Sequence, residues 1–438
     1  RFAHPPLTQT LNGKRLFEST LVGITRLARQ TLRLVAPQRL QAQLFALVAV
    51  ALLLAVLSSW SVPLRWGDRA RLPTSPAFAL LWIIGTVCAF GVAAKAKYHR
   101  MVALTLLGGA GLVTCLTFVW FSAPDLALTQ LVVEVVTAIL FLLGLRWLPM
   151  RIKVASRVAS RDWLRRARDL VLAVSVGAGL SALSFAMLTR PAPHSISPFF
   201  LRHALPGGGG ANVVNVMLVD FRAFDTLGEI TVLCAVALTV FALLRRFRPP
   251  KESVGQPQQQ RVLPPDVATD LVKPRTEEDT KRGYLLVPTV IARLFLPITL
   301  VIAAHLLLRG HNLPGGGFVA GLCVAVGFIV QYLVAGTLWV EARARLWPVR
   351  WMAVGLLLAV GTGLGAVGWG YPFLTTHTAH VALPLLGAVH LPSATFFDLG
   401  VFAVVVGTTL LILTALGHQS LRAHRTQQGP TRPHQESP

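Results

Sequence analysis

Charged residues are scarce in this sequence, and their scarcity limits the kind of protein it can encode. Only 13% of the residues are Asp, Glu, Lys or Arg, whereas 54% are hydrophobic. A soluble globular chain carries charge on roughly a quarter of its residues. An ordinary soluble fold is therefore excluded, and a membrane protein is indicated.

Cysteine pairs and the motifs of common enzymes are also lacking. The four cysteines show no paired spacing, so neither a disulfide framework nor a zinc site is predicted. No P-loop, dinucleotide-binding glycine pattern or Ser/His/Asp order occurs. We therefore predict no catalytic residue, no metal site, no cofactor and no enzymatic activity.

What the sequence has instead is long apolar runs, each about 20 residues and so long enough to cross a bilayer as a helix. They predict an all-α, polytopic membrane protein with ten transmembrane helices. The runs cover approximately residues 43–60, 78–94, 101–121, 126–148, 168–188, 227–245, 286–308, 315–336, 350–371 and 398–417.

The basic residues, which give a net charge of +23, lie mostly on alternate sides of these runs. Cytoplasmic segments of membrane proteins carry such an excess of Lys and Arg, so both termini are predicted to be cytoplasmic. The same bias argues against nucleic acid as the partner and for membrane lipid. We expect a multi-pass protein of a bacterial inner membrane. Because the chain opens with Arg1 and has no signal sequence, we expect a piece of a longer protein or a natural fusion product.

Changes in composition divide the chain into six segments. An amphipathic basic stretch, Arg151–Leu170, is expected to lie along the inner membrane surface, and a Pro- and Gln-rich linker separates about six helices from about four. The predicted segments are a basic cytoplasmic connector (1–42), a first membrane part (43–150), an amphipathic and second membrane part (151–245), a cytoplasmic linker (246–283), a further membrane domain (284–417) and a disordered tail (418–438).

A glycine-rich motif, "RGHNLPGGGF", lies between two apolar runs on the predicted outer side. Its small residues suit close packing at a subunit interface. Alternatively, its bare backbone lines a hydrated vestibule. A similar stretch, Leu205–Val216, also lies on the outer side, and we expect both to form loops. The motif residues of interest are His305, His311, Asn312, Gly315, Gly316 and Gly317.

Three acidic residues have a simple structural explanation. Asp125, Glu229 and Asp398 each follow a Ser or Thr by three residues, just before an apolar run. This is the capping-box pattern, in which side chains satisfy the free N–H groups of a helix start. We expect these carboxylates to cap their own helices.

Glu134 cannot be explained as a cap. It lies about 13 Å along its helix from Asp125, at about 1.5 Å per residue, and thus near the middle of the membrane. An acidic side chain there costs about 2.5–3.5 kcal/mol and needs a partner or a wet cavity. Gln130 and Thr137 lie one turn away and form a polar stripe with it. We predict a proton- or cation-carrying role, with structural hydrogen bonding to a neighbouring helix as the alternative.

A polar cluster precedes the sixth run. Asp220 and Arg222 are expected to form an ion pair. We therefore favour a role in packing or in contact between subunits over a role in binding sodium ions as they pass through. The cluster comprises Asn212, Asn215, Asp220, Arg222 and Asp225.

Four stretches resemble one family, the Mrp-type cation/proton antiporters, which are built from several subunits. "SAPDLALTQLVVEVVTAILFLLGLRWLP" and "GGANVVNVMLVDFRAFDTLGEITVL" resemble the C-terminal region of the A subunit of these antiporters. "LFLPITLVIAAHLLLRGHNLPGGGFVAGL" and "FFDLGVFAVVVG" resemble the B subunit of the same family. The large antiporter-like portion of the A subunit has no counterpart here.

This resemblance implies a membrane subunit that works with other subunits to exchange Na⁺ for H⁺. It also implies that Glu134 matches an acidic residue on the ion path. We predict that Asp125, Gln130 and Thr137 share this path with Glu134. The residues predicted as polar lining or caps are Asp220, Arg222, Asp225, Glu229 and Asp398. A scaffold without a transport role, and a subunit of a redox pump related to membrane hydrogenase, are the alternatives.

Overall fold

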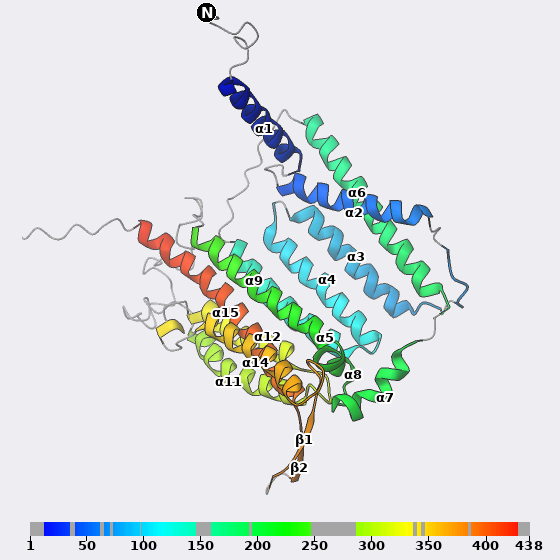
Figure 1. Cartoon of the computed structure of the whole chain (residues 1–438), viewed down its shortest axis with the longest axis vertical. Helices are drawn as coiled ribbons and strands as arrows, with labels where there is room; N and C mark the ends of the chain where they lie inside the picture. The colour runs from blue at the N-terminus through cyan, green and yellow to red at the C-terminus, as the bar shows by residue number, and fades with distance from the viewer. Residues whose placement is uncertain are drawn as a thin grey trace, which may run out of the picture. The chain divides into compact units, whose positions relative to one another are not determined.

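The computed structural model describes residues 13–35, 40–61, 65–70, 73–96, 98–145, 159–191, 195–246, 286–335, 340–342, 347–383 and 387–427. Within these ranges, 10 helices are long and apolar enough to cross a membrane (Figure 1). They are α2 (Leu40–Ser61), α3 (Pro76–Lys95), α4 (Arg100–Trp120), α5 (Pro124–Leu145), α6 (Ala159–Thr189), α9 (Ala223–Arg246), α11 (Leu286–Arg309), α12 (Gly317–Ala335), α14 (Pro348–Gly368) and α15 (Ala394–Gln427).

These helices coincide with the apolar runs, so the predicted all-α polytopic class is confirmed. Proline marks several of the starts: Pro76, Pro124 and Pro348 are the first residues of α3, α5 and α14. Proline suits the first turn because its missing N–H would have no partner there and its fixed φ is already helical. The side of the membrane on which the termini lie stays a prediction.

Two segments between the long helices contain regular structure, and one of them includes Leu205–Val216, which we expected to form a loop. Residues 197–221 form α7 (Ser197–Gly208), α8 (Val213–Val216) and a π-helical turn, η1 (Met217–Phe221). The segment before α15 is an antiparallel hairpin of β1 (Thr378–Leu383) and β2 (Gly387–Pro392). Local hydrogen bonding satisfies backbone groups that a loose loop would leave without partners.

From Ala159 onward the stretch Arg151–Leu170 forms the first turns of α6, which continues into the apolar part; its place along the membrane surface stays a prediction. One further prediction is corrected. The predicted disordered tail begins as helix, because α15 extends to Gln427. Residues 151–158, 247–285 and 428–438 lie outside the described ranges, so most of the predicted linker does too.

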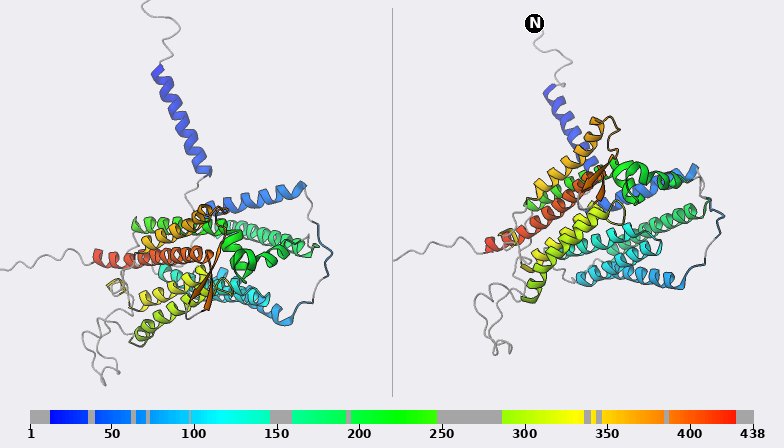
Figure 2. Two further views of the ribbon diagram at one scale, coloured as in Figure 1. Left: turned by 60° about the horizontal axis from the view of Figure 1, so that its bottom comes forward. Right: turned by 90° about the horizontal axis from the view of Figure 1, so that it is seen from below.

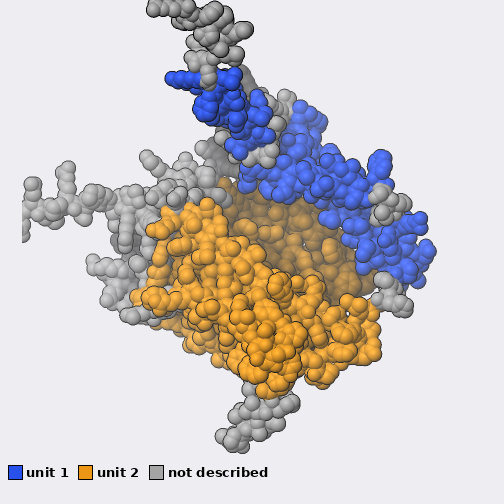
Figure 3. Space-filling model, in the orientation of Figure 1, with its two compact units in different colours: residues 1–73, 153–194 blue, residues 74–152, 195–438 orange. Residues whose placement is uncertain are grey.

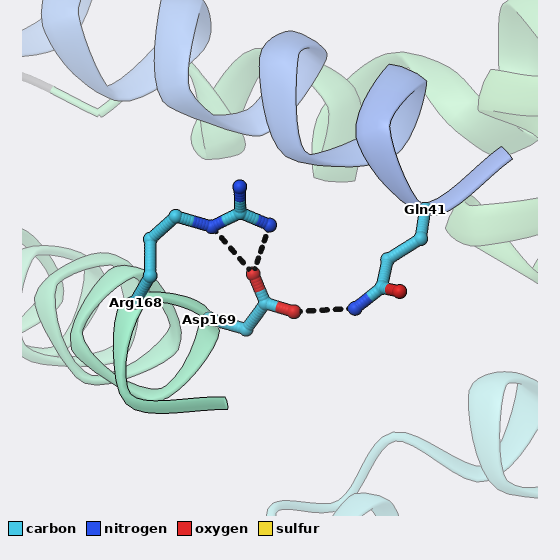
Figure 4. Close-up of polar contacts among 3 residues, drawn as sticks. All are labelled: Gln41, Arg168 and Asp169. Atoms are coloured by element: carbon cyan, nitrogen blue, oxygen red, sulfur yellow. Dashed lines mark hydrogen bonds and ion pairs between the residues drawn. The ribbon is translucent and has the colours of Figure 1, made fainter. Parts of the chain in front are cut away.

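The chain divides into two compact units (Figure 3). The first comprises residues 1–73 and 153–194 and contains the N-terminal helix α1 (Gly13–Val35), α2 and α6. In it, Gln41 of α2 donates a 2.6 Å hydrogen bond to Asp169 of α6, which also pairs with Arg168 (Figure 4). At the far end of α6, the Thr189 carbonyl accepts the N–H of Arg69 at 3.0 Å.

The second unit comprises residues 74–152 and 195–438. Its apolar core centres on α12 and α15, where Ile329, Phe397, Val404 and Leu410 are almost completely buried. The helices run alongside one another, and α7, α8 and the hairpin gather at one end of them (Figures 1 and 2). The polar residues singled out in the sequence meet at this end.

Candidate functional site

The glycine motif forms a tight turn between α11 and α12. Gly316 has a φ of 100°, a conformation that favours glycine, and its N–H donates to the Leu306 carbonyl at 3.0 Å. A Cβ on Gly310 would lie 2.2 Å from the Gly316 nitrogen. Backbone therefore packs on backbone here, and the glycines provide the space.

Two carboxylates from distant helices bind the N–H groups of this turn. Asp125, in the first turn of α5, accepts the N–H of Gly315 at 3.1 Å. Asp398, on α15, accepts the N–H of Gly317 at 2.7 Å. The expectation that each caps its own helix is corrected: Asp398 binds at the start of α12, where a negative charge is also favoured by the helix dipole.

Asn212 connects the segment before α9 to the same turn. Its Nδ2 donates to the carbonyls of Gly310 and Leu313, each at 3.1 Å, and lies 3.4 Å from Asp125 Oδ1. Its Oδ1 accepts the N–H of Val214 and so caps α8. A reciprocal bond runs from the Ala211 N–H to Asn312 Oδ1, at 3.1 Å.

His311 is buried at the centre of this cluster. Its Nε2 lies 2.8 Å from the Gly208 carbonyl oxygen, and its Nδ1 lies 3.2 Å from Asn215 Oδ1. Burial lowers the pKa of His311, while the Gly208 carbonyl and the charge of Asp220 act to raise it. A Cβ on Gly210 would lie 2.3 Å from the His311 carbonyl oxygen, so this contact also needs glycine.

Asp220 lies beside the histidine, on η1. Burial raises the pKa of Asp220, and the hydrogen bond from the N–H of Thr376, at 2.9 Å, opposes that effect. The predicted pair of Asp220 and Arg222 does not form. Arg222 instead makes an ion pair with Asp225, one helical turn further on.

The other predicted site residues lie apart from these contacts. Glu229 is exposed on α9, and the hydroxyl of Thr226, its proposed capping-box partner, donates to the Leu218 carbonyl. His305 Nε2 lies 3.4 Å from Arg309 Nη1, and Arg309 Nε donates to the Pro314 carbonyl at 2.8 Å. These two residues hold the end of α11 against the turn.

Glu134 lies halfway along α5 and is half-buried. Gln130 Nε2 donates to its Oε2 at 3.3 Å, which confirms that part of the polar stripe. Thr137 donates to the Val133 carbonyl of its own helix instead. The carboxyl group packs against α4 at Gly111, where a Cβ would lie 2.1 Å from Glu134 Oε2.

Sequence reasoning missed two partners in the cluster, Thr376 and the carbonyl of Gly208. Both act through backbone atoms, which leave no signature of residue type. The likeness between the glycine stretches at 205–216 and 313–322 is the one signal that could have linked them, and the two stretches do meet, because Asn212 donates to the Leu313 carbonyl. In the described ranges, no group of three or more His, Cys, Asp or Glu side chains is placed to hold a metal ion.

Three protein-family models match consecutive parts of the chain. The model for the D subunit of MBH matches residues 84–150, and the model for the E subunit of MBH matches residues 164–261. The model described as "Domain related to MnhB subunit of Na+/H+ antiporter" matches residues 287–411.

Curated relatives cover the chain in one piece or in parts. The A/B subunit of the "Probable K(+)/H(+) antiporter" of Rhizobium meliloti is 51% identical over 442 residues, which is 99% of this chain and 44% of the relative. The B subunit of the Na(+)/H(+) antiporter of Bacillus subtilis is 46% identical over 125 residues, 28% of this chain and 85% of the relative. The A subunit of the same antiporter is 42% identical over 147 residues, 33% of this chain and 18% of the relative. The chain thus spans less than half the length of the Rhizobium relative.

A solved structure has the same fold. The Mrp complex from Dietzia sp. DQ12-45-1b contains a chain that matches with a TM-score of 0.72 and 30% sequence identity. The match covers 94% of this chain and 42% of that one.

Proposed function

This chain belongs to the Mrp-type family of cation/proton antiporters, and in it the C-terminal region of an A subunit is joined to a B subunit. We propose that it forms part of the path for protons or cations in such a complex. It is a multi-pass bacterial membrane protein and a transporter subunit rather than an enzyme. Its partners in this proposal are the other subunits of the complex.

The observation that carries the proposal is the carboxyl group of Glu134 halfway along a membrane-spanning helix. Such a group is costly there unless it is paired or wet. Its described contacts are one amide donor and a glycine on the next helix. A carboxyl group held in this way suits the uptake and release of a proton or a small cation.

The wider arrangement is part of the same proposal. Residues 43–245 act as the A-like part and residues 284–417 as the B-like part, joined by the linker at 246–283, in line with the family models at 84–150, 164–261 and 287–411. The complex exchanges external protons for cytoplasmic Na⁺ or K⁺, the ions named for the relatives. It does so as a secondary transporter of the inner membrane with both termini of this chain in the cytoplasm.

The experiment replaces Glu134 by Gln in the full complex, expressed in a host that lacks its own antiporters. Cation-dependent proton movement in everted vesicles is expected to fall by about tenfold or more, because a positioned proton carrier contributes at least that much. Native gel electrophoresis verifies that the complex still assembles. Activity that is unchanged in a normally assembled complex would show that the chain is a scaffold.

Gly111→Ala provides a second test that keeps the carboxyl group. The new Cβ would lie 2.1 Å from Glu134 Oε2, so the side chain must move away from α4. We expect a loss of transport with normal assembly. Gly108→Ala on the same helix is the matched control, because nothing lies within 4 Å of its added Cβ. Equal activity in the two variants would argue against a positioned carrier at Glu134. Proton movement that required an electron donor would indicate a redox pump instead.

A further inference from the structure

Three buried polar side chains form a continuous connection through the outer cluster. His311, Asn215 and Asp398 are exposed by only 8%, 7% and 7%, and each belongs to a different segment. Asn215 contacts His311 on one side, with 3.2 Å between Oδ1 and Nδ1. On the other side its Nδ2 lies beside Asp398, because Asn215 Nδ2 and Asp398 Oδ2 would lie 2.7 Å and 3.4 Å from a Cβ added to Gly316. The two end residues, His311 and Asp398, can titrate, whereas Asn215 between them cannot.

The two ends of this connection are fixed by backbone atoms. The carbonyl oxygen of Gly208 can only accept a hydrogen bond, so Nε2 of His311, 2.8 Å away, must carry a hydrogen. The N–H of Gly317 can only donate, so Oδ1 of Asp398, 2.7 Å away, must accept. The protonation state of His311 is therefore decided at Nδ1, and that of Asp398 at its second carboxyl oxygen, and both atoms face Asn215.

A carboxamide has an acceptor end and a donor end, and this limits the protonation states. With Oδ1 toward His311 and Nδ2 toward Asp398, the hydrogen bonds are all satisfied when the imidazole is charged and the carboxylate is ionised. With the amide turned over, Nδ2 donates to Nδ1 of a neutral imidazole. Its Oδ1 then accepts the O–H of a protonated Asp398.

These two states contain the same number of protons. One proton is lost from Nδ1 of His311 and one is gained by Asp398, while the amide of Asn215 makes a half-turn. Any other combination sets two donors or two acceptors against each other and leaves a buried polar group without a hydrogen-bond partner, which is unfavourable. The amide thus ties the charge of the histidine to the charge of the aspartate.

We propose that His311, Asn215 and Asp398 form a binding site for a single proton, which the histidine and the aspartate share through the turning amide. The site is separate from the carboxyl group of Glu134, which bonds to Gln130. Any use of this proton in transport rests on the function proposed above, whereas the sharing itself does not.

Opposing influences act on the charge of His311. Burial acts against the imidazolium, whereas the Gly208 carbonyl and the charge of Asp220 support it. Other titratable or charged groups approach the cluster from α5, from the end of α11 and from the segment before β1. They are Asp125, His305, Arg309 and His377.

The test titrates both groups in the assembled complex. Histidine NMR signals, with His311→Gln for assignment, report the imidazole, and the carboxyl infrared band, with Asp398→Asn for assignment, reports the aspartate. In the native chain both signals are expected to change together at one pH, where the single shared proton is lost as the pH rises. Independent titration at separate pH values would overturn the proposal, and this measurement does not depend on transport activity.

A double-mutant cycle separates the amide from simple charge attraction. Asp398→Asn presents a fixed donor to Asn215, which then holds His311 neutral, so the midpoint of His311 should fall by about one pH unit or more. In the Asn215→Leu background the same change should produce a much smaller shift. An equal shift of the His311 midpoint in both backgrounds would mean that the two groups are coupled through space alone and would contradict the proposal.

Asn312→Ala serves as the control for this cycle. Asn312 lies in the same turn and accepts a backbone N–H from Ala211, but its side chain is bonded to neither titrating group. It should leave the effect of Asp398→Asn unchanged. If Asn312→Ala alters that effect as strongly as Asn215→Leu does, the cluster responds to any loss of packing and the shared proton is not supported.

Discussion

His311 and Asp220 lie side by side, and burial and the charge of the neighbour act on the pKa of each in opposite directions. Burial lowers the pKa of His311 and raises that of Asp220, so it disfavours the charge on both. The charge of each acts in the opposite direction on its neighbour. Because folded His311 binds its proton less tightly than the unfolded chain does, its contribution to stability is complete above about pH 6.5 and declines as the pH falls below that value.

Asp220→Asn should lower the pKa of His311 further. The amide oxygen can still accept the Thr376 N–H, which bonds to Asp220 Oδ1 at 2.9 Å, but the negative charge that supports the imidazolium is gone. NMR titration of His311 in the assembled complex measures the shift. Asp225→Asn is the control, since Asp225 pairs with Arg222 at the surface. An unchanged or raised midpoint in Asp220→Asn would contradict the electrostatic account.

At this scale the sequence identified many of the right residues but not their partners. Asp125, His311, Asn312 and Asp398 were all singled out because a polar residue beside an apolar run needs a reason. Their partners are backbone groups far away in sequence, such as the N–H of Gly315 for Asp125. For Asp125 and Asp398, capping of their own helices was predicted because sequence spacing reports local contacts alone, and long-range contacts depend on how the helices pack.

The helices α14 and α15 approach each other closely at glycine residues. A Cβ on Gly400 would lie 2.7 Å from the Gly355 carbonyl oxygen, and one on Gly355 would lie 2.6 Å from the Gly400 carbonyl oxygen. Further along, a Cβ on Gly407 would lie 2.7 Å from the Pro348 carbonyl oxygen. Small residues at these crossings allow backbone contact, which helps membrane helices associate where water does not drive them together.

Gly400→Ala should therefore separate α14 from α15. The added methyl group meets backbone that cannot turn aside as a flexible side chain could, and overpacking of this kind costs about 1–3 kcal/mol. Thermal unfolding of the purified complex measures the loss. Gly361→Ala on α14 is the matched control, with nothing within 4 Å of the added Cβ. A similar melting temperature for the two variants would count against tight packing at this crossing.

The long helices were readable from the sequence because each run of apolar residues has one stable form in a membrane. The short elements were not. Leu205–Val216, which lies partly in α7 and α8, was expected to be a loop, and the hairpin before α15 was not anticipated, because short segments outside the membrane have no comparable constraint on composition. Their positions depend on the polar contacts described above, which join residues about 100 positions apart, as in the 101 that separate Ala211 from Asn312.

Across the whole molecule, burial is unevenly distributed among the described spans. In the most apolar window of α12 and of α15, 61% and 72% of the residues are buried, whereas in α2 none is. Apolar side chains such as Leu47, Leu54 and Trp60 on α2 are more than half exposed. Helices with this much uncovered apolar surface are suited to lipid or to the membrane helices of other subunits, as the proposed complex requires.

The two halves of this chain correspond to separate proteins in Bacillus subtilis, where the relatives are named as the A and B subunits of an antiporter. A cut within residues 246–283, with both pieces co-expressed, should therefore still give an assembled complex. Direct contacts of α5 with α12 and of α9 with α15 remain, as do the bonds from Asn212 and Asp125 to the glycine turn. Co-purification of one piece with a tag on the other measures the association.

The cut also makes the polar contacts between the halves measurable. In the intact chain a linker keeps the halves at high effective concentration, so losing the two 3.1 Å hydrogen bonds of Asn212 by Asn212→Ala should barely change assembly. In the cut chain the same loss, worth about 1–3 kcal/mol, should reduce co-purification several-fold. Thr239→Ala on α9, whose hydroxyl donates to its own helix, should have no such effect. If Asn212→Ala weakens the intact and the cut protein equally, the residue stabilises its own half, and the glycine turn is not what holds the two halves together.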